Sequence, residues 1–498
     1  MNEHTDHPSR GKFPLSFLWV GSTVVLCALF ILASVPMAAA QGRDQETKRY
    51  TSMLQNVFDF IRSHYVEEVD PKVLYEGAMM GMFDALEDPY SVFLHESEMT
   101  SLSENVIQGS YGGVGLYISK PVGERPDGKP PYVEVASPIE DTPGWRAGMQ
   151  PGDLIVEVDG EPTDVLSLDE VVSRLKGPPG TSVRLLVRRG KKLEFPVSIV
   201  REVVEVPTVK QAMIGDIGYL RLISFSVMTV ERTKEALEHF KAQNYRSLII
   251  DLRNNYGGLL QSAVGIGDLF LEDGVVVSVK SRISSENAVF NAKRSVMVSP
   301  EIPIVVLINR GSASASEIVA GALKDRGRAY LVGEKSFGKG SVQQVYPLDT
   351  TGFKITTARY YTPSDVNIDK IGIPPDREVL FPEFTEENAE HLNRLITDNR
   401  IPAFVEENPE AGSALVDSFV QELHAEYSID VPLLRRLVRD EQNRTVIAPV
   451  YDLEYDVQLR EAVNILRGGT YGALMRTTKT LKVLQEEADS EDDTALAS

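Results

Sequence analysis

The spacing of apolar residues changes along this chain, and each change predicts a different kind of structure. Over residues 41–105 apolar side chains recur at the intervals of an amphipathic helix, as at Leu54, Val57 and Ile61. We therefore expect this segment to be helical.

Residues 106–203 predict a small, mostly β domain. Short alternating runs such as YGGVGLYI, DLIVEVDG and SVRLLVRRG are broken by glycine and proline, which is typical of strands joined by tight turns. One helix is expected near Leu168–Leu175.

Residues 204–383 contain nearly continuous apolar runs at 247–253, 302–309 and 329–333. Such runs are typical of parallel strands that are buried on both faces, and the stretches between them have helical spacing. We therefore expect a multidomain α/β protein, with the β-rich domain inserted before this α/β core and helical segments at both ends.

The C-terminal region, residues 384–498, is again helical in pattern and ends in six acids between Glu486 and Asp493. This composition predicts a disordered acidic tail. The whole chain has a formal net charge of −21, so the phosphates of a nucleic acid would be repelled over most of its surface, and nucleic acid is excluded as a partner.

Residues 1–40 predict export. Arg10 and Lys12 precede an apolar run over residues 13–35, and small residues follow at 38–40. This is the pattern of a signal peptide, although the length of the run also fits an uncleaved membrane anchor. Either alternative places the remaining chain in the periplasm or at the outer face of the cytoplasmic membrane.

Cysteine usage restricts the chemistry of the exported part. The one cysteine, Cys27, lies within the apolar run. The exported part therefore cannot form a disulfide, act as a cysteine peptidase or bind a metal through thiolates. No metal or cofactor is expected.

Residues 309–344 hold the most informative pattern. A predicted strand ends at Asn309 and is followed by Ser312, Ser314 and Ser316, after which a helix begins. A serine between a strand and a helix lies near backbone N–H groups and the positive helix pole, both of which can stabilise an oxyanion. Glu317 is expected only to complement that pole.

A serine nucleophile also needs a general base. The exported part contains the histidines His64, His95, His239, His391 and His424. Only His239 falls in the α/β region, where it is predicted to lie on the exposed face of a helix, so a Ser-His-Asp triad is disfavoured. A lysine can act instead if burial lowers its pKa from about 10.4 toward 7. Lys339, flanked by two glycines, is the candidate.

These residues resemble the C-terminal processing peptidases, also called tail-specific proteases. The stretches GSASASEI and GEKSFGKGSVQ match that family in residue type and spacing. The resemblance implies peptide hydrolysis by a Ser-Lys pair on a crotonase-like α/β core. It assigns Ser314 as nucleophile, Lys339 as base and Gln343 as the residue that supports the lysine.

The upstream stretch DLRNNYGGLL also resembles the family. The resemblance implies that Gly257 or Gly258 supplies one oxyanion-hole N–H group and that Ala315 supplies the other. Two departures from the family pattern lie nearby: Tyr256 stands where proline is common, and DVNID occupies residues 365–369. Neither touches the predicted pair.

The β-rich domain resembles a PDZ domain. The stretches GGVGL, AGMQPGDLIVEVDGEP and LKGPPGTSVRLLVRR carry the likeness, which implies that the C-terminal tails of substrates bind at Gly113, Val114, Gly115 and Leu116. Lys176 is expected either to sense a bound tail or to be an exposed helix-end cation. The oligomeric state stays open, and the helical ends are compatible with a homodimer.

Two other functions were weighed. GEKSFGKG is close to a phosphate-binding loop, but Gly340 replaces the hydroxyl residue that would reach magnesium, and a strand pattern follows. A non-catalytic PDZ scaffold would be favoured by a degenerate serine or lysine position, and neither position is degenerate.

Overall fold

The computed structural model describes residues 45–103, 109–120, 130–190, 193–294, 296–380, 386–443 and 449–496. The chain divides into two compact units, residues 1–82 and 83–498. The predicted export segment lies outside the described residues. Within the described ranges, no helix is both long and apolar enough to span a membrane.

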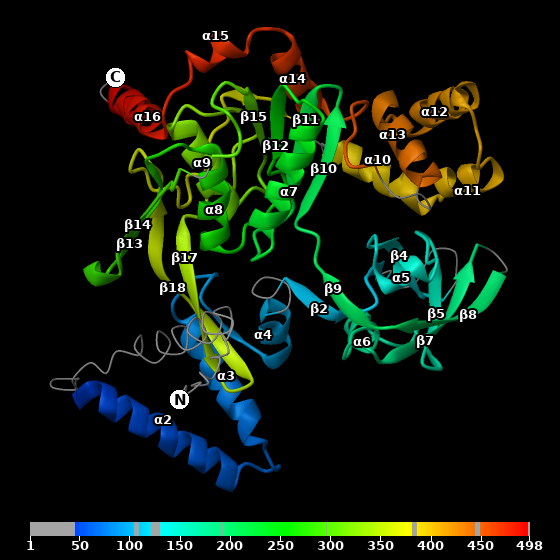
Figure 1. Cartoon of the computed structure of the whole chain (residues 1–498). Coiled ribbons are helices and arrows are strands. Elements are labelled where there is room, and N and C mark those ends of the chain that lie inside the picture. The colour runs from blue at the N-terminus through cyan, green and yellow to red at the C-terminus, as the bar shows by residue number, and fades with distance from the viewer. Residues whose placement is uncertain are drawn as a thin grey trace, which may run out of the picture. The chain divides into compact units, whose positions relative to one another are not determined.

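The N-terminal region is only partly helical. Helices α2 (Gln45–His64) and α3 (Pro71–Asp84) are followed by a turn, by strand β1 (Val92–Leu94) and by α4 (Glu96–Leu102) (Figure 1). Strand β1 therefore departs from the expectation that residues 41–105 are helical. The run Val92-Phe93-Leu94 has β-branched and aromatic character, and it pairs with a strand of the core.

The β-rich domain is a six-stranded antiparallel sheet with two short helices. Its strands are β3 (Leu116–Ser119), β4 (Val133–Pro138), β5 (Leu154–Val158), β6 (Glu161–Pro162), β7 (Ser182–Arg189) and β8 (Leu193–Val200). Helix α5 (Pro143–Arg146) is short. Helix α6 (Leu168–Leu175) has the predicted bounds, and Ser167 caps it because its Oγ accepts the Glu170 N–H at 3.2 Å.

The chain enters and leaves this domain through a separate two-stranded ribbon. Strand β2 (Ser110–Gly113) pairs with β9 (Glu202–Glu205). The domain has its own apolar core, in which Val133, Ile155 and Val183 are fully buried.

The α/β core contains the predicted buried strands. Its sheet has the order β10 (Val209–Ile214), β11 (Ile217–Leu222), β12 (Ser247–Asp251), β15 (Ile304–Ile308), β16 (Tyr330–Gly333) and β19 (Arg377–Glu378). All neighbours are parallel except the first pair. The three apolar runs thus form adjacent parallel strands, which confirms that prediction.

Helices cover both faces of this sheet. Helices α7 (Thr229–Ala242), α8 (Leu260–Phe270) and α9 (Ala315–Asp325) lie on one face (Figure 1). Helices α14 (Val457–Arg467) and α15 (Tyr471–Met475) pack on the other face. Alternate residues of one strand therefore pack in two different apolar cores. Ile250 belongs to the core beneath α7, α8 and α9, and Ile249 belongs to the core beneath α14 and α15.

A second, antiparallel sheet extends the core. It consists of β13 (Val275–Ser281), β14 (Ala288–Asn291), β17 (Ser341–Leu348), β18 (Thr351–Tyr361) and β1. A short 3-10 helix (Ser284–Glu286) joins β13 to β14. The hairpin β17–β18 begins at Ser341, two residues after Lys339, so it helps to position that residue.

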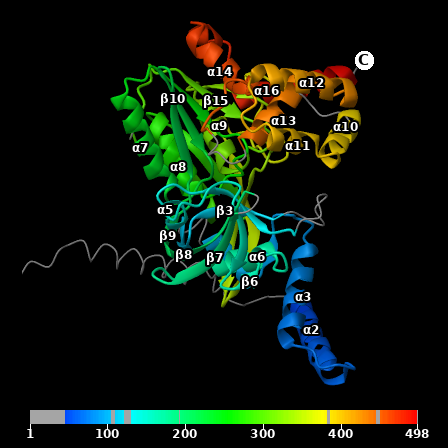
Figure 2. The same cartoon turned by 90° about the vertical axis from the view of Figure 1, so that its right-hand side faces the viewer.

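The C-terminal region contains a compact helical cluster: α10 (Glu386–Thr397), α11 (Arg400–Glu407), α12 (Ser413–Tyr427) and α13 (Val431–Gln442) (Figure 2). Buried Val420, Leu423 and Leu434 form its own core. The cluster lies in sequence between β19 and α14, both of which belong to the α/β core.

The acidic end differs from the prediction of disorder. Helix α16 (Leu481–Leu496) runs through it. Its first residue is anchored, because Leu481 is buried in the main core and its N–H donates to Asp325 Oδ1 at 2.7 Å. The ion pair between Lys479 and Glu487 offsets part of the negative charge.

Candidate active site

Ser314 lies where the sequence predicts it, between the end of β15 and the start of α9, and it is almost fully buried. The hydroxyls of the neighbouring serines have structural partners. Ser312 Oγ donates to the Leu252 carbonyl at 2.8 Å, and Ser316 Oγ donates to the Asn255 carbonyl at 2.8 Å. Among the described residues, no group accepts a hydrogen bond from the Ser314 hydroxyl. Ser314 is therefore the one of the three that is suited to be a nucleophile.

The backbone of Ser314 is strained. Its φ of 56° and ψ of −112° are uncommon for a residue with a side chain. The Ser314 N–H donates to Glu317 Oε2 at 2.8 Å, and its carbonyl accepts the Ile318 N–H at 3.0 Å. These two hydrogen bonds hold the serine at the N-terminus of α9.

The glycine loop packs directly against this turn. A Cβ atom on Gly257 would lie 2.8 Å from Ser314 Cβ, and one on Gly258 would lie 2.1 Å from the Phe225 carbonyl oxygen. Both residues have positive φ, so only glycine fits without strain. The Gly257 N–H donates to Asn255 Oδ1 at 2.9 Å. The Gly258 N–H has no acceptor within the described part of the chain, so it is the loop amide that is available for an oxyanion.

Ala315 is the first residue of α9. The first N–H groups of a helix have no carbonyl partner within it and carry the positive pole. The Ala315 amide can therefore serve as a second donor beside the Ser314 hydroxyl.

A buried ionic network anchors the start of the glycine loop. Arg253 Nη2 lies 2.7 Å from Asp251 Oδ2 and 2.6 Å from Asp456 Oδ2. The Tyr219 hydroxyl donates to Asp251 at 2.7 Å. Burial alone would raise the pKa of Asp251, but Arg253 and the hydrogen bonds hold that pKa below its ordinary value. Asp251 thus organises the loop, and Asp456 is a contributor that no sequence motif indicated.

Glu317 does more than complement the helix pole, so the sequence-based expectation for this residue is wrong. Its fully buried carboxylate accepts hydrogen bonds from Ser314 N–H, Ser336 Oγ, Gly338 N–H and Lys339 N–H at 2.6–2.8 Å. Burial raises its pKa, and the four hydrogen bonds act in the opposite direction. One side chain therefore fixes the backbone of the nucleophile turn to the backbone of the lysine turn.

Lys339 is the half-buried candidate base. Burial is the main cause that lowers its pKa, and the nearby Lys354 lowers it further, whereas Asp88 and Glu317 act in the opposite direction. Its Nζ lies over the Tyr90 ring, 4.5 Å from the centroid. The direction of the pKa shift is the one that a lysine base requires.

The side chains of the predicted pair are not yet joined. Within the described residues, no hydrogen bond links Ser314 Oγ to Lys339 Nζ. Gln343 Nε2 donates to Ser341 Oγ at 2.8 Å and to Thr356 Oγ1 at 3.2 Å, and no hydrogen bond links Gln343 to Lys339. The structure thus brings the two turns together through Glu317 and leaves the lysine and glutamine side chains with other partners.

The five histidines belong to other elements. His239 lies exposed on α7, as predicted, and contacts Gln243. His64, His391 and His424 lie on α2, α10 and α12, and His95 precedes α4. None lies on the two turns that carry Ser314 and Lys339.

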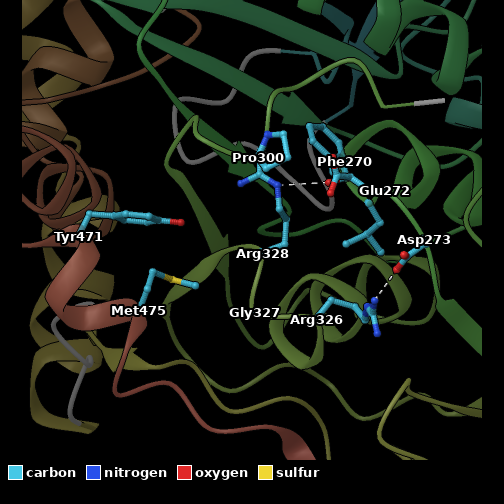
Figure 3. Close-up of a pocket in the computed structure, with 10 residues that line it drawn as sticks. Phe270, Glu272, Asp273, Pro300, Arg326, Gly327, Arg328, Tyr471 and Met475 are labelled. Atoms are coloured by element: carbon cyan, nitrogen blue, oxygen red, sulfur yellow. Dashed lines mark hydrogen bonds and ion pairs between the residues drawn. The ribbon is translucent and has the colours of Figure 1, made fainter. Parts of the chain in front are cut away.

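A cavity of about 400 Å³ opens at the opposite end of α9. Arg326 and Arg328 line this cavity (Figure 3). They follow the last residue of α9, whereas Ser314 precedes its first. Arg326 pairs with Asp273 at 2.8 Å, and Arg328 donates to three backbone carbonyls. Eleven helical residues span about 16 Å, so this cavity is separate from the turn that carries Ser314.

The predicted tail-binding loop of the β-rich domain is held by backbone hydrogen bonds. The Val114 carbonyl accepts the Gly144 N–H at 2.7 Å, and the Gly115 carbonyl accepts the Ile139 N–H at 2.9 Å. Strand β3, which follows at Leu116, is an edge strand with β4 as its one strand partner among the described residues. Its outer edge can therefore accept an added strand.

Lys176, the predicted sensor or helix-end cation, lies at the C-terminus of α6. Its Nζ lies over the Tyr111 ring, 5.0 Å from the centroid. Because Tyr111 belongs to β2, this contact connects the end of α6 with the ribbon through which the chain enters the domain.

Comparison with known proteins agrees with this architecture. A model of peptidase family S41 matches residues 216–379, a PDZ-domain model matches 134–189, and a model of the activating protease CtpB N-terminal domain matches 32–98. The carboxy-terminal-processing protease of Bartonella bacilliformis is 37% identical over 360 residues, which cover 70% of this chain and 80% of that protein. The carboxy-terminal processing protease CtpA of Bacillus subtilis is 31% identical over 381 residues, which cover 76% and 79%.

Proposed function

We propose that this chain, which belongs to peptidase family S41 and is a serine peptidase of the carboxy-terminal-processing kind, uses Ser314 as nucleophile and Lys339 as general base. The observation that carries the proposal is the Glu317 carboxylate, which ties the backbone N–H groups of Ser314 and Lys339 to a single oxygen, Oε2. The two turns are therefore held side by side.

The chemistry follows from the groups on these turns. Neutral Lys339 removes the proton from Ser314 Oγ, which attacks the peptide carbonyl. The N–H groups of Gly258 and Ala315 stabilise the oxyanion. The Lys339 ammonium then protonates the leaving amine, and water hydrolyses the acyl-enzyme by the same steps. Gln343 would support Lys339 after its side chain turns from Thr356.

The test is hydrolysis of an unstructured peptide with an apolar, free C-terminus. Ser314→Ala and Lys339→Ala should each reduce kcat by at least about 10³-fold, and the double variant should be no worse than either single one, because the two groups act as a unit. Lys335→Ala is the matched control, since Lys335 is exposed on the same turn. An inactive Ser312→Ala beside an active Ser314→Ala would show that the nucleophile is misassigned.

The PDZ domain is proposed to select substrates by their C-terminal carboxylate. The glycines before β3 allow backbone N–H groups to converge on a carboxylate, and the open edge of β3 can pair with the peptide. A bound tail would then place upstream residues within reach of Ser314.

Amidation tests this proposal, because it replaces the C-terminal carboxylate by a neutral amide and leaves the rest of the peptide unchanged. We expect the amidated peptide to have a KM at least about tenfold higher than that of the free peptide with the intact enzyme. Equal hydrolysis of the two peptides would exclude carboxylate capture as the source of specificity.

Export is proposed from the charged start and apolar run of residues 1–40. The expected product is a periplasmic or membrane-anchored enzyme at the outer face of the cytoplasmic membrane. N-terminal sequencing of the native protein distinguishes cleavage after residue 40 from an uncleaved anchor. Recovery of the full chain from the cytoplasm would exclude both.

A homodimer is proposed from the surface of α2. Leu54, Val57 and Phe60 are 50–62% exposed on this helix, and apolar side chains on a helix are favoured where a partner covers them. Sedimentation analysis of the wild type and of a Leu54→Ser, Val57→Ser variant tests this: we expect a dimer that the variant loses. A monomeric wild type would exclude the proposal.

A further inference from the structure

One aromatic ring beside the candidate base has no part in the chemistry above. Tyr90 is half-buried, and its ring faces the Lys339 Nζ at 4.5 Å from the centroid. A cation within about 6 Å of an aromatic face is attracted by the negative potential of that face, more strongly where water is excluded. Tyr90 is therefore placed to act on the charged form of Lys339.

The position of Tyr90 is set by a hydrogen-bonded turn, residues 88–91. The Tyr90 N–H donates to Asp88 Oδ1 at 3.0 Å, and Ser91 Oγ donates to Asp88 Oδ2 at 2.6 Å. Burial would raise the pKa of Asp88, but hydrogen bonds from Ser91 and Thr356 hold that pKa below its ordinary value. The acceptor at the centre of the turn is therefore ionised and strong.

The same turn is bound to the hairpin that carries the base. Thr356 on β18 donates from its hydroxyl to Asp88 Oδ2 at 2.6 Å and from its N–H to Ser91 Oγ at 2.9 Å. Gln343 Nε2 donates to the Thr356 hydroxyl at 3.2 Å. The turn of residues 88–91 therefore contacts Lys339 through the Tyr90 ring, and it is connected to Gln343 through Thr356.

We propose that Tyr90 is a positioning residue for Lys339, and that its ring stabilises the ammonium that forms when Lys339 takes the proton from Ser314. The inference rests on the function proposed above. The proton passes from Ser314 Oγ to Lys339 Nζ and later to the leaving amine, so no further reactant is needed.

The charges around Lys339 determine what removal of the ring would do. Burial and Lys354 on β18 disfavour the ammonium, whereas Asp88 and Glu317 favour it. Burial raises the pKa of the Tyr90 phenol, and the negative charges of Asp369, Glu317 and Asp88 raise it further. A side chain of similar size without a π face would keep the burial and remove the attraction, so the pKa of Lys339 would fall further.

The experiment compares Tyr90→Phe, which keeps the ring face, with Tyr90→Leu, which keeps apolar bulk alone, in the full-length enzyme. We expect the Phe variant to have the kcat/KM profile of the wild type. In the Leu variant the acidic limb should move to lower pH by about 0.5–1 unit, and the alkaline plateau should fall about 2- to 10-fold. A purely structural loss would lower the plateau and leave the limb in place or move it to higher pH.

Two further measurements make each outcome decisive. If Tyr90→Leu does not fold, phenylalanine carrying increasing numbers of fluorine atoms is introduced at position 90. The acidic limb of the kcat/KM profile should then move stepwise to lower pH as the negative potential of the π face weakens. Lys339→Ala is assayed in parallel. An active Lys339→Ala enzyme would overturn the proposed function, whereas an inactive one beside an unmoved limb would overturn the role of Tyr90 alone.

Discussion

The two halves of the proposed catalytic centre, a nucleophile half and a base half, are built in different ways. The nucleophile half consists of Ser314, Gly258 and the first turn of α9, and it lies at the C-terminal ends of β12 and β15, which are buried along their whole length. The base half consists of Lys339 and Gln343, both half-buried at the start of a hairpin. The first half has its groups in place, and the second has its side chains bonded elsewhere.

Glu317 connects the backbones of the two halves. The Ser314 N–H and the Lys339 N–H both donate to its Oε2, each at 2.8 Å. The backbones of the two halves are therefore fixed to each other. We therefore propose that the Ser-Lys pair forms by rotation of the Lys339 and Gln343 side chains when a bound substrate excludes water.

The nucleophile half should tolerate the least change. Gly258→Ala would place a Cβ atom 2.1 Å from the Phe225 carbonyl oxygen at a φ of 145°. The loop must shift, so the oxyanion donor is displaced, and we expect kcat to fall by about 10²–10³-fold. Steady-state peptide hydrolysis measures the effect.

Gly160→Ala is the matched control for that variant. Gly160 also has positive φ, but a Cβ atom there would meet nothing within 4 Å. We expect this variant to retain near-normal kcat. A Gly258→Ala enzyme within threefold of the wild type would show that this amide does not bind the oxyanion.

The anchor of the glycine loop should have the next largest effect. Asp456→Asn can still cap α14 by accepting the Leu459 N–H, but it removes the charge that pairs with Arg253. We expect kcat to fall about tenfold with KM within twofold, because a nearly buried arginine loses one of its two carboxylates. The control is Glu461→Gln, which removes an exposed pair with Arg377 from the same helix. Equal kinetics of the two variants would contradict a link between α14 and the loop.

Sequence alone predicts the parts of this site that are local. The serine turn, the glycine pair and the glycine-flanked lysine each occupy a few consecutive residues, so their composition indicates their chemistry. The contacts that join them are distant along the chain: Arg253 and Asp456 are 203 residues apart. No periodicity or motif predicts such a pair, because it depends on how α14 packs against the sheet.

Glu317 and the acidic tail show the same limit. The position of Glu317 in the first helical turn explains one of its hydrogen bonds, but the other three come from residues 336–339. The acids near Glu486 predict disorder by composition. They continue a helix because Leu481 packs in the core and bonds to Asp325, a tertiary contact that composition does not reveal.

The base half should control the pH dependence of the reaction. Burial lowers the pKa of Lys339, so kcat/KM should rise with pH through an apparent pKa below the ordinary lysine value of about 10.4. Histidine-directed modification should change the rate less than twofold, since no histidine lies on the turns that carry Ser314 and Lys339. A profile that is flat from about pH 6 to 10 would contradict a lysine base.

The smallest expected effect is a gain in stability when the base is removed. The folded-state pKa of Lys339 lies below its unfolded value, so its contribution to stability is full above about pH 10.4 and is lost as pH falls through the folded value. At neutral pH the buried ammonium therefore destabilises the fold.

Lys339→Met keeps the bulk and removes the charge, and it should raise Tm by a few degrees at pH 7, where about 1 kcal/mol corresponds to about 2–4 °C. The gain should shrink toward pH 10.5, whereas Lys335→Met, at an exposed position, should leave Tm unchanged at both pH values. A lower Tm for Lys339→Met at pH 7 would show that the ammonium is stabilised in the resting enzyme, and the base half would then be as well ordered as the nucleophile half.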